Sequence, residues 1–104
     1  YLNPDGDLWR EPKNKYCYKI GKKSDRYKMV LHLTNNRGYQ RTVDISTALN
    51  GKNQQSIRTE IRKINKNFRK FLKITNNKLI ESRKGNGYRI NQNYKIILKD
   101  NVGL

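Results

Sequence analysis

The apolar positions in the first part of the chain change their spacing from every second residue to every third or fourth. From Tyr16 to Ile20, aromatic and apolar residues alternate with other residues, which predicts a short strand with one buried face. From there the spacing becomes helical, and Ser24 or Asp25 can cap the start of a helix. We expect Gly38 to terminate this helix. Its expected buried stripe consists of Tyr27, Val30, Leu31 and Thr34.

A second, shorter helix is expected in the middle of the chain. Residues 39–43 are short and β-prone, and Asp44 can cap a helix that follows them. Asn50 and Gly51 then favour a turn that ends this helix. The apolar residues that share one of its faces are Ile45, Ala48 and Leu49.

The longest periodic segment covers residues 53–72. Its apolar residues recur at steps of four and three, which is typical of an amphipathic helix. They are Ile57, Ile61, Ile64, Phe68 and Phe71 or Leu72. The opposite face carries Gln55, Thr59, Arg62, Lys66, Arg69 and Lys73. Glu60 is the only acidic residue between Lys52 and Lys78, so this face is strongly basic.

Two segments after the long helix predict an antiparallel hairpin. Residues 78–82 and 87–91 both alternate in the manner of strands. Gly85 and Gly87 lie between or beside them and can supply the positive φ angles that a tight turn needs. Residues 93–99 are expected to form one more strand.

The two ends of the chain are expected to lie outside the main domain. Residues 1–15 hold both prolines and no repeating apolar pattern, so we expect a flexible N-terminal arm. Leu8 and Trp9 are the residues of this arm that could dock on the domain. The domain itself is expected to cover residues 16–99, followed by a tail at residues 100–104.

The charge of the chain points to a polyanionic partner. Lysine and arginine outnumber aspartate and glutamate by 24 to 8 in 104 residues, which gives a net charge of +16. Such a charge favours nucleic acid, an anionic membrane or an acidic protein. The chain is also rich in Lys, Asn and Ile, as an AT-rich genome would encode. The position of the charge is therefore more informative than its amount.

The order of the expected elements places this charge on a DNA-binding fold. Two helices joined by a glycine turn and followed by a hairpin predict an α+β winged helix-turn-helix, with three helices, a C-terminal β-hairpin wing and a short N-terminal strand. The long helix would enter the major groove, where Gln and Arg can bind base edges and Lys can bind phosphates. The wing would reach the minor groove or flanking phosphates. The expected DNA-binding residues are Gln54, Gln55, Ser56, Arg58, Thr59, Arg62, Lys63, Lys66, Arg69 and Lys70 on the helix and Arg83, Lys84, Asn86 and Arg89 on the hairpin.

Two stretches of the chain resemble one family of DNA-binding proteins. QSIRTEIRKINKNFRKFL followed by LIESRKGNGYRIN is similar to the recognition helix and wing of the response-regulator type of winged-helix transcription factor. In that family a basic helix leads into a wing with a Gly-x-Gly-Tyr pattern, which here is residues 85–88. The resemblance implies a DNA-binding output domain, with a helix starting near Gln54 that reads bases and a wing that contacts the minor groove.

No residue pattern in the chain predicts an enzyme. Cys17 is the only cysteine, so it can form no internal disulfide and has no second thiol for a zinc site. His32 lies among leucines without a second ligand, so we expect a satisfied, partly buried side chain. Asp44, Glu60 and Glu81 belong to three different elements and do not form a nuclease-type cluster. We therefore expect no catalytic residue, no metal and no cofactor.

The expected function is sequence-specific binding of double-stranded DNA, in the role of a transcription regulator. The chain begins with Tyr1 rather than Met, so further domains of a larger parent protein are compatible with it, as is a homodimer on DNA. No run of eighteen apolar residues exists, so we expect no membrane partner and a cytoplasmic, nucleoid-associated location.

Three alternatives share the same basic surface. The chain could be the DNA-binding module of a plasmid or phage replication initiator, or an RNA-binding or ribosomal protein. It could also be a winged helix that docks on a protein, with the basic face of the long helix merely solvated. Competition between duplex DNA and structured RNA separates these alternatives, because the major groove of A-form RNA is too narrow to admit a helix.

Overall fold

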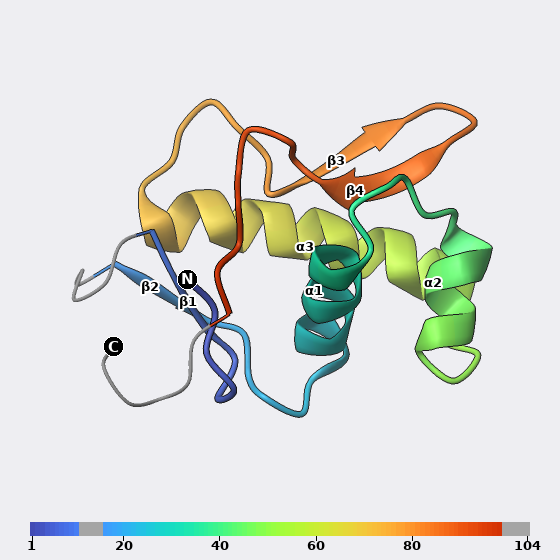
Figure 1. Ribbon diagram of the computed structural model, residues 1–104, viewed down its shortest axis with the longest axis horizontal. Coiled ribbons are helices and arrows are strands. Elements are labelled where there is room, and N and C mark those ends of the chain that lie inside the picture. The colour runs from blue at the N-terminus through green and yellow to red at the C-terminus, as the bar shows by residue number, and fades with distance from the viewer. Residues whose placement is uncertain (11–15, 99–104) are drawn as a thin grey trace.

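The longest helix, α3, crosses the middle of the molecule, and the other helices and both hairpins pack along it (Figure 1). The computed structural model describes residues 1–10 and 16–98. Its architecture is α+β, with three helices between an N-terminal two-stranded hairpin and a C-terminal hairpin. The elements are β1 (Asp7–Trp9), β2 (Cys17–Lys19), α1 (Asp25–Asn35), α2 (Thr42–Ala48), α3 (Gln54–Leu72), β3 (Ile80–Arg83) and β4 (Gly87–Ile90).

Helix α3 begins and ends at residues with clear capping roles. The side chain of Asn53 accepts hydrogen bonds from the backbone N–H groups of Gln55 and Ser56, at 2.8 and 3.2 Å. Lys73 ends the helix in the left-handed conformation, with φ at 55°. The predicted amphipathic stripe is confirmed, and of the two candidates for its last position Leu72 is buried whereas Phe71 is 43% exposed. The buried apolar residues of the helix are Ile57, Ile61, Ile64, Phe68 and Leu72.

The start of α1 follows the prediction, but its buried face differs. Ser24 caps the helix, because its hydroxyl oxygen accepts a hydrogen bond from the Tyr27 N–H at 3.1 Å. The expected stripe was wrong apart from Val30: its other three members are only half-buried. The face of α1 that packs on neighbouring elements, among them α3 and β4, carries a different set of side chains from the expected one. The buried residues of α1 are Met29, Val30 and Leu33.

The end of α1 also differs from the prediction. The helix ends at Asn35, and the side chain of Asn36 donates a hydrogen bond to the carbonyl of His32 at 2.8 Å. Gly38 lies beyond this cap and has no positive φ angle, so it does not terminate the helix. A side-chain bond to an unpaired carbonyl of the last turn satisfies this end in place of a glycine.

Helix α2 begins two residues before the position at which Asp44 was expected to cap it. Asp44 lies in the first turn, and its carboxylate accepts a hydrogen bond from the Arg41 backbone N–H at 3.1 Å. Thr42, expected in a β-prone segment, is therefore helical. The predicted break after the helix is confirmed, because Asn50 and Gly51 have φ angles of 58° and 82°.

The predicted C-terminal hairpin is confirmed, and a third segment pairs with it. Strands β3 and β4 are antiparallel, with Glu81 opposite Arg89 in the register. Gln40, between α1 and α2, forms a bridge with Tyr88 through two backbone hydrogen bonds of 2.7 and 2.8 Å. Gly87 has a φ of +105° next to this bridge.

A buried asparagine ties the hairpin to α3. Asn65 is only 7% exposed, and its amide nitrogen donates to the Ile80 carbonyl at 3.0 Å. Its amide oxygen accepts from the Ile80 N–H at 2.9 Å. The Asn65 side chain thus pairs with the outer edge of β3 in the manner of a neighbouring strand.

The first ten residues belong to the folded unit, so the expectation of a flexible arm is wrong for them. Strand β1 pairs with β2, and Leu2 and Leu8 are 1% and 3% exposed. Burial of these two leucines offsets the entropy of ordering the segment. The expected docking of Leu8 is confirmed, while Trp9 is half-buried. Residues 11–15 and the expected tail at 100–104 lie outside the described residues.

The expected strand at residues 93–99 is wrong for its described part. Residues 94–97 form no regular strand, and Leu98 makes only an isolated bridge with Leu2. Leu2 also donates its backbone N–H to the Ile97 carbonyl at 2.9 Å. Residues 97 and 98 therefore run beside the N-terminal segment, and their described backbone pairing is limited to Leu2.

Replacement of Asn65 by alanine is expected to destabilise the protein and loosen the hairpin. It leaves the N–H and C=O groups of Ile80 unpaired, at about 1–3 kcal/mol for each buried group. Chemical denaturation gives the loss of stability, and hydrogen exchange of the hairpin amides reports the loosening. The control is Asn67→Ala, because Asn67 is half-buried and donates only one long bond, 3.5 Å, to the Tyr18 hydroxyl. Equal stability losses in the two variants would contradict the role assigned to Asn65.

Gly87→Ala is expected to destabilise the protein more than Gly85→Ala. Both glycines have positive φ angles, +105° and +83°, so both variants carry backbone strain of about 1–3 kcal/mol. A Cβ at Gly87 would also lie 2.1 Å from the Gln40 carbonyl oxygen, whereas at Gly85 it would meet nothing within 4 Å. Thermal unfolding of the two variants measures the difference, and equal midpoints would show that the Gln40 bridge is unimportant.

Candidate nucleic-acid interface

The outward face of α3 lies opposite the buried stripe and collects amide and basic side chains. Gln55, Arg62, Lys66 and Lys70 on this face are exposed, while Thr59 is half-buried. The other expected contact residues of the helix lie beside them: Gln54, Arg58, Lys63 and Arg69 are exposed, and Ser56 is half-buried. The structure thus leaves most of the helical residues of the predicted site exposed, and the remaining two half-buried.

Some residues of this surface already have partners within the protein. Gln54 accepts a hydrogen bond from the Thr42 hydroxyl at 2.8 Å, which links the starts of α2 and α3. The side-chain oxygen of Gln55 accepts a long bond of 3.4 Å from Arg58. The ammonium of Lys63 lies 3.9 Å from Glu60.

The tip of the β3–β4 hairpin carries the rest of the predicted site, with one exception. Arg83, Lys84 and Asn86 are exposed at this tip. Arg89 instead binds Glu81, with nitrogen–oxygen distances of 2.8 and 2.9 Å, and its guanidinium lies 4.2 Å from the centre of the Tyr39 ring. A cation that is already paired and stacked is less available to a ligand. The structure therefore separates Arg89 from the other expected contact residues.

Three of the four acidic residues in residues 16–98 form ion pairs within the protein, and the fourth, Asp44, accepts a backbone hydrogen bond from Arg41. The four residues are Asp25, Asp44, Glu60 and Glu81. Glu60 pairs with Arg26 and raises the pKa of that guanidinium through a side-chain hydrogen bond. A hydrogen bond from Lys52, at 2.9 Å, lowers the pKa of the Asp25 carboxyl.

As a result, four cations of this surface have no ion-pair partner among the described residues. Among the described residues, no ion pair within 4.0 Å involves Arg62 or Lys66 on α3. The same holds for Arg83 and Lys84 on the hairpin. These side chains are free to bind an anion without first breaking a pair.

A cleft separates the first half of α3 from the hairpin. This α3–hairpin cleft has a volume of about 280 Å³ and is lined by Gln55, Arg58, Arg62, Lys78, Ser82 and Tyr88 together with the buried residues beneath them. A second hollow of about 510 Å³ shares Arg58, Ser82 and Tyr88 and extends to Arg41 and the hairpin tip.

Two basic residues of these hollows, Arg41 and Lys78, were absent from the predicted site. Arg41 belongs to the segment that was expected to be extended, so its place at the start of α2 was not anticipated. Lys78 precedes β3, and only the packing of the hairpin on α3 brings it to the cleft. The signal in the sequence was the basic character of both positions, without information on which face they would share.

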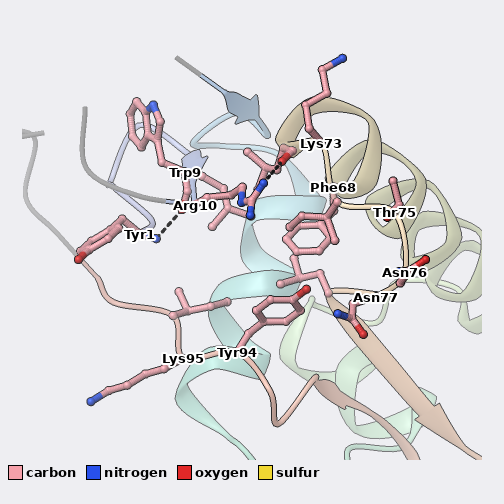
Figure 2. A pocket seen from close by; sticks show the side chains of 15 residues that line it. Tyr1, Trp9, Arg10, Phe68, Lys73, Thr75, Asn76, Asn77, Tyr94 and Lys95 are labelled. Atoms are coloured by element: carbon pink, nitrogen blue, oxygen red, sulfur yellow. Dashed lines mark hydrogen bonds between the residues drawn. The ribbon is translucent and has the colours of Figure 1, made fainter. Parts of the chain in front are cut away.

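A second cavity lies at the opposite end of α3, between β1 and the C-terminal segment (Figure 2). It has a volume of about 470 Å³, and Phe68 and Tyr94 meet edge to face inside it, with ring centroids 5.4 Å apart. Arg10 reaches across to donate to the Leu72 carbonyl at 3.3 Å (Figure 2). None of the predicted DNA-binding residues lines this cavity.

The side chains considered for other chemistry are His32, Cys17 and the acidic residues. Within residues 1–10 and 16–98, no group of three His, Cys, Asp or Glu side chains could hold a metal ion. The expectation of a satisfied His32 is wrong for one atom, because its buried Nε2 has no hydrogen-bond partner among the described residues. Cys17 is half-buried, and burial raises the pKa of its thiol. No described helix combines the length and apolar character needed to cross a membrane.

Comparison of the chain with protein-family models, with curated proteins and with solved structures found no match.

The uncompensated surface predicts a steep dependence of nucleic-acid binding on salt. If α3 and the hairpin together neutralise about six to eight phosphates, the logarithm of affinity falls against the logarithm of salt concentration with a slope of about −5 to −7. Titration of a labelled duplex at several salt concentrations measures this slope. A slope shallower than about −2 would mean that the cations of this surface do not contact phosphates.

Proposed function

We propose that this protein is a winged helix-turn-helix domain that binds duplex DNA in a sequence-specific manner. The observation that carries the proposal is that exposed, uncompensated cations on α3 and on the hairpin tip lie on two elements that flank one cleft. Two elements of this kind can contact two adjacent grooves of a duplex.

The order of the elements supports this proposal. Helix α1, the bridge at Gln40, helices α2 and α3 and the β3–β4 hairpin follow one another as in a winged helix-turn-helix. The turn between α2 and α3 is held by the Ser46 hydroxyl, which donates to the Lys52 carbonyl at 2.6 Å. Together with the bond between Thr42 and Gln54, this contact fixes the orientation of α3 relative to α2.

In this proposal α3 is the recognition helix. Glu60 is the only acidic residue of α3, and it is bound to Arg26. The major groove is wide enough to admit an α-helix, and its base edges offer acceptors that Arg and Gln side chains bind. Gln55, Thr59 and Arg62 lie in the first half of α3 and would read bases, while Lys66 and Lys70 would bind phosphates.

The hairpin is the wing in this proposal. Its tip projects beyond the helices (Figure 1) and carries Arg83, Lys84 and Asn86 around Gly85. A narrow, cationic tip fits the minor groove or the phosphates that border it. The biological role that follows is that of a transcription regulator acting in the cytoplasm on nucleoid DNA, alone, as a homodimer or as part of a longer chain.

Arg62→Ala and Lys66→Ala are expected to have different effects on binding. Loss of a base contact by Arg62 should cost about 1–3 kcal/mol on a duplex selected from random sequence, with little change on a scrambled duplex. Loss of a phosphate contact by Lys66 should weaken both duplexes alike and reduce the salt slope by about one. Binding of each variant to both duplexes at two salt concentrations makes the measurement.

Two outcomes would contradict the proposed function. Identical behaviour of the two variants on both duplexes would show that α3 does not read bases, so that binding is non-specific. Stronger binding to structured RNA than to the selected duplex would also contradict the proposal. The major groove of A-form RNA does not admit a helix, so α3 could not bind RNA in the proposed manner.

A further inference from the structure

The outer edge of β3 has a free hydrogen-bonding residue in the α3–hairpin cleft. In an antiparallel ladder, alternate residues turn their N–H and C=O groups to the same side. Ile80 turns these groups outward to Asn65, so Ser82, two residues later, turns its own groups to the same outer side. Tyr88, which faces Ser82 in the register, likewise uses its backbone groups on the far side, to bind Gln40.

The surroundings of Ser82 favour an anion. Arg58, Arg62 and Lys78 line the same cleft, and no acidic side chain is among the described residues that line it. The cleft volume of about 280 Å³ exceeds several times the roughly 30 Å³ that one water molecule occupies, so a phosphate group has room to enter. A backbone N–H together with guanidinium groups is a strong combination of donors for phosphate oxygens.

We propose that the α3–hairpin cleft binds a backbone phosphate of the duplex, held by Arg58 and by the N–H of Ser82, with Lys78 beside it. This inference rests on the proposed function. If α3 lies in the major groove and the hairpin reaches the neighbouring minor groove, the strand that separates these two grooves must pass between the helix and the hairpin. The cleft lies at this position, so a phosphodiester of that strand meets the donors of both walls.

The proposal gives Arg58 a different task from Arg62. Arg58 also lines the second hollow, next to the hairpin tip, so it lies between the two DNA-contacting elements. A phosphate bound there fixes the register of the protein on the duplex and carries no sequence information itself. Arg58 is therefore a positioning contact, and its loss should weaken all duplexes alike.

The test is a scan of the selected duplex with single methylphosphonate groups, each of which removes the charge of one phosphate. For the unmodified protein, neutralising the phosphate bound in the cleft should weaken binding about ten- to hundred-fold, the range for losing hydrogen bonds to a charged group. Arg58→Gln should bind the unmodified duplex more weakly and lose most of its sensitivity at that one position. Lys23→Gln, which removes one positive charge from an exposed site after β2, is the matched control and should keep the whole profile.

A pair of variants at Ser82 tests the backbone donor. Ser82→Pro removes the N–H, which is tolerated at an edge strand where this group lies outside the ladder. Ser82→Ala keeps the N–H and removes only the hydroxyl. We expect the proline variant, and not the alanine variant, to lose sensitivity at the same phosphate as Arg58→Gln. If the proline variant fails to fold, the Arg58 profile still decides.

The outcomes separate this inference from the proposed function. If the unmodified protein binds no duplex, the proposed function is wrong and the cleft has no duplex phosphate to bind. If the protein binds a selected duplex but Arg58→Gln keeps the full profile of phosphate sensitivity, duplex binding stands and the phosphate site in the cleft is wrong.

Discussion

Two hydrogen bonds between the Asn65 side chain and the backbone of Ile80 fix the position of the β3–β4 hairpin on α3. A carboxamide offers a donor and an acceptor side by side, so it can satisfy both groups of a strand edge at once. Aspartate would lack the donor and leucine would lack both, and either would leave buried backbone groups unpaired. On the other edge of the hairpin, Gln40 pairs with Tyr88. The hairpin is thus fixed from both edges, and the cleft between it and α3 has a defined width.

The acidic residues connect elements of the fold and so leave the basic surface uncompensated. Arg26 on α1 pairs with Glu60 on α3, and Lys52 pairs with Asp25 at the start of α1. Each of these pairs joins two segments that are distant in the sequence. The cations on the outward face of α3 then repel one another, a repulsion that salt screens and that a bound polyanion would relieve. The same arrangement therefore favours a folded core and a polyanionic ligand.

The two ends of the chain show where local patterns fail. Residues 1–10 have one proline and no period, yet Leu2 and Leu8 are buried, because Leu8 pairs with Tyr18 of β2 and the end of the described chain returns to pair with Leu2. Residues 93–98 have the composition of a strand but form a single bridge. The two segments share the bridge between Leu2 and Leu98, which are 96 residues apart in the sequence, and such a contact leaves no periodic signal in either segment.

The sequence by itself determined α3 and the β3–β4 hairpin, because their signals are local. Helix α3 is long enough for its apolar spacing to select one buried face, and Gly85 and Gly87 supply the positive φ angles that the turn requires. It also determined that most of the basic residues on these elements would be exposed. Only the tertiary structure decided which of them share a surface. Arg89 pairs with Glu81 on the far side of the hairpin, while Lys78 is brought into the cleft, because the packing of the hairpin through Asn65 sets which side of each strand faces α3.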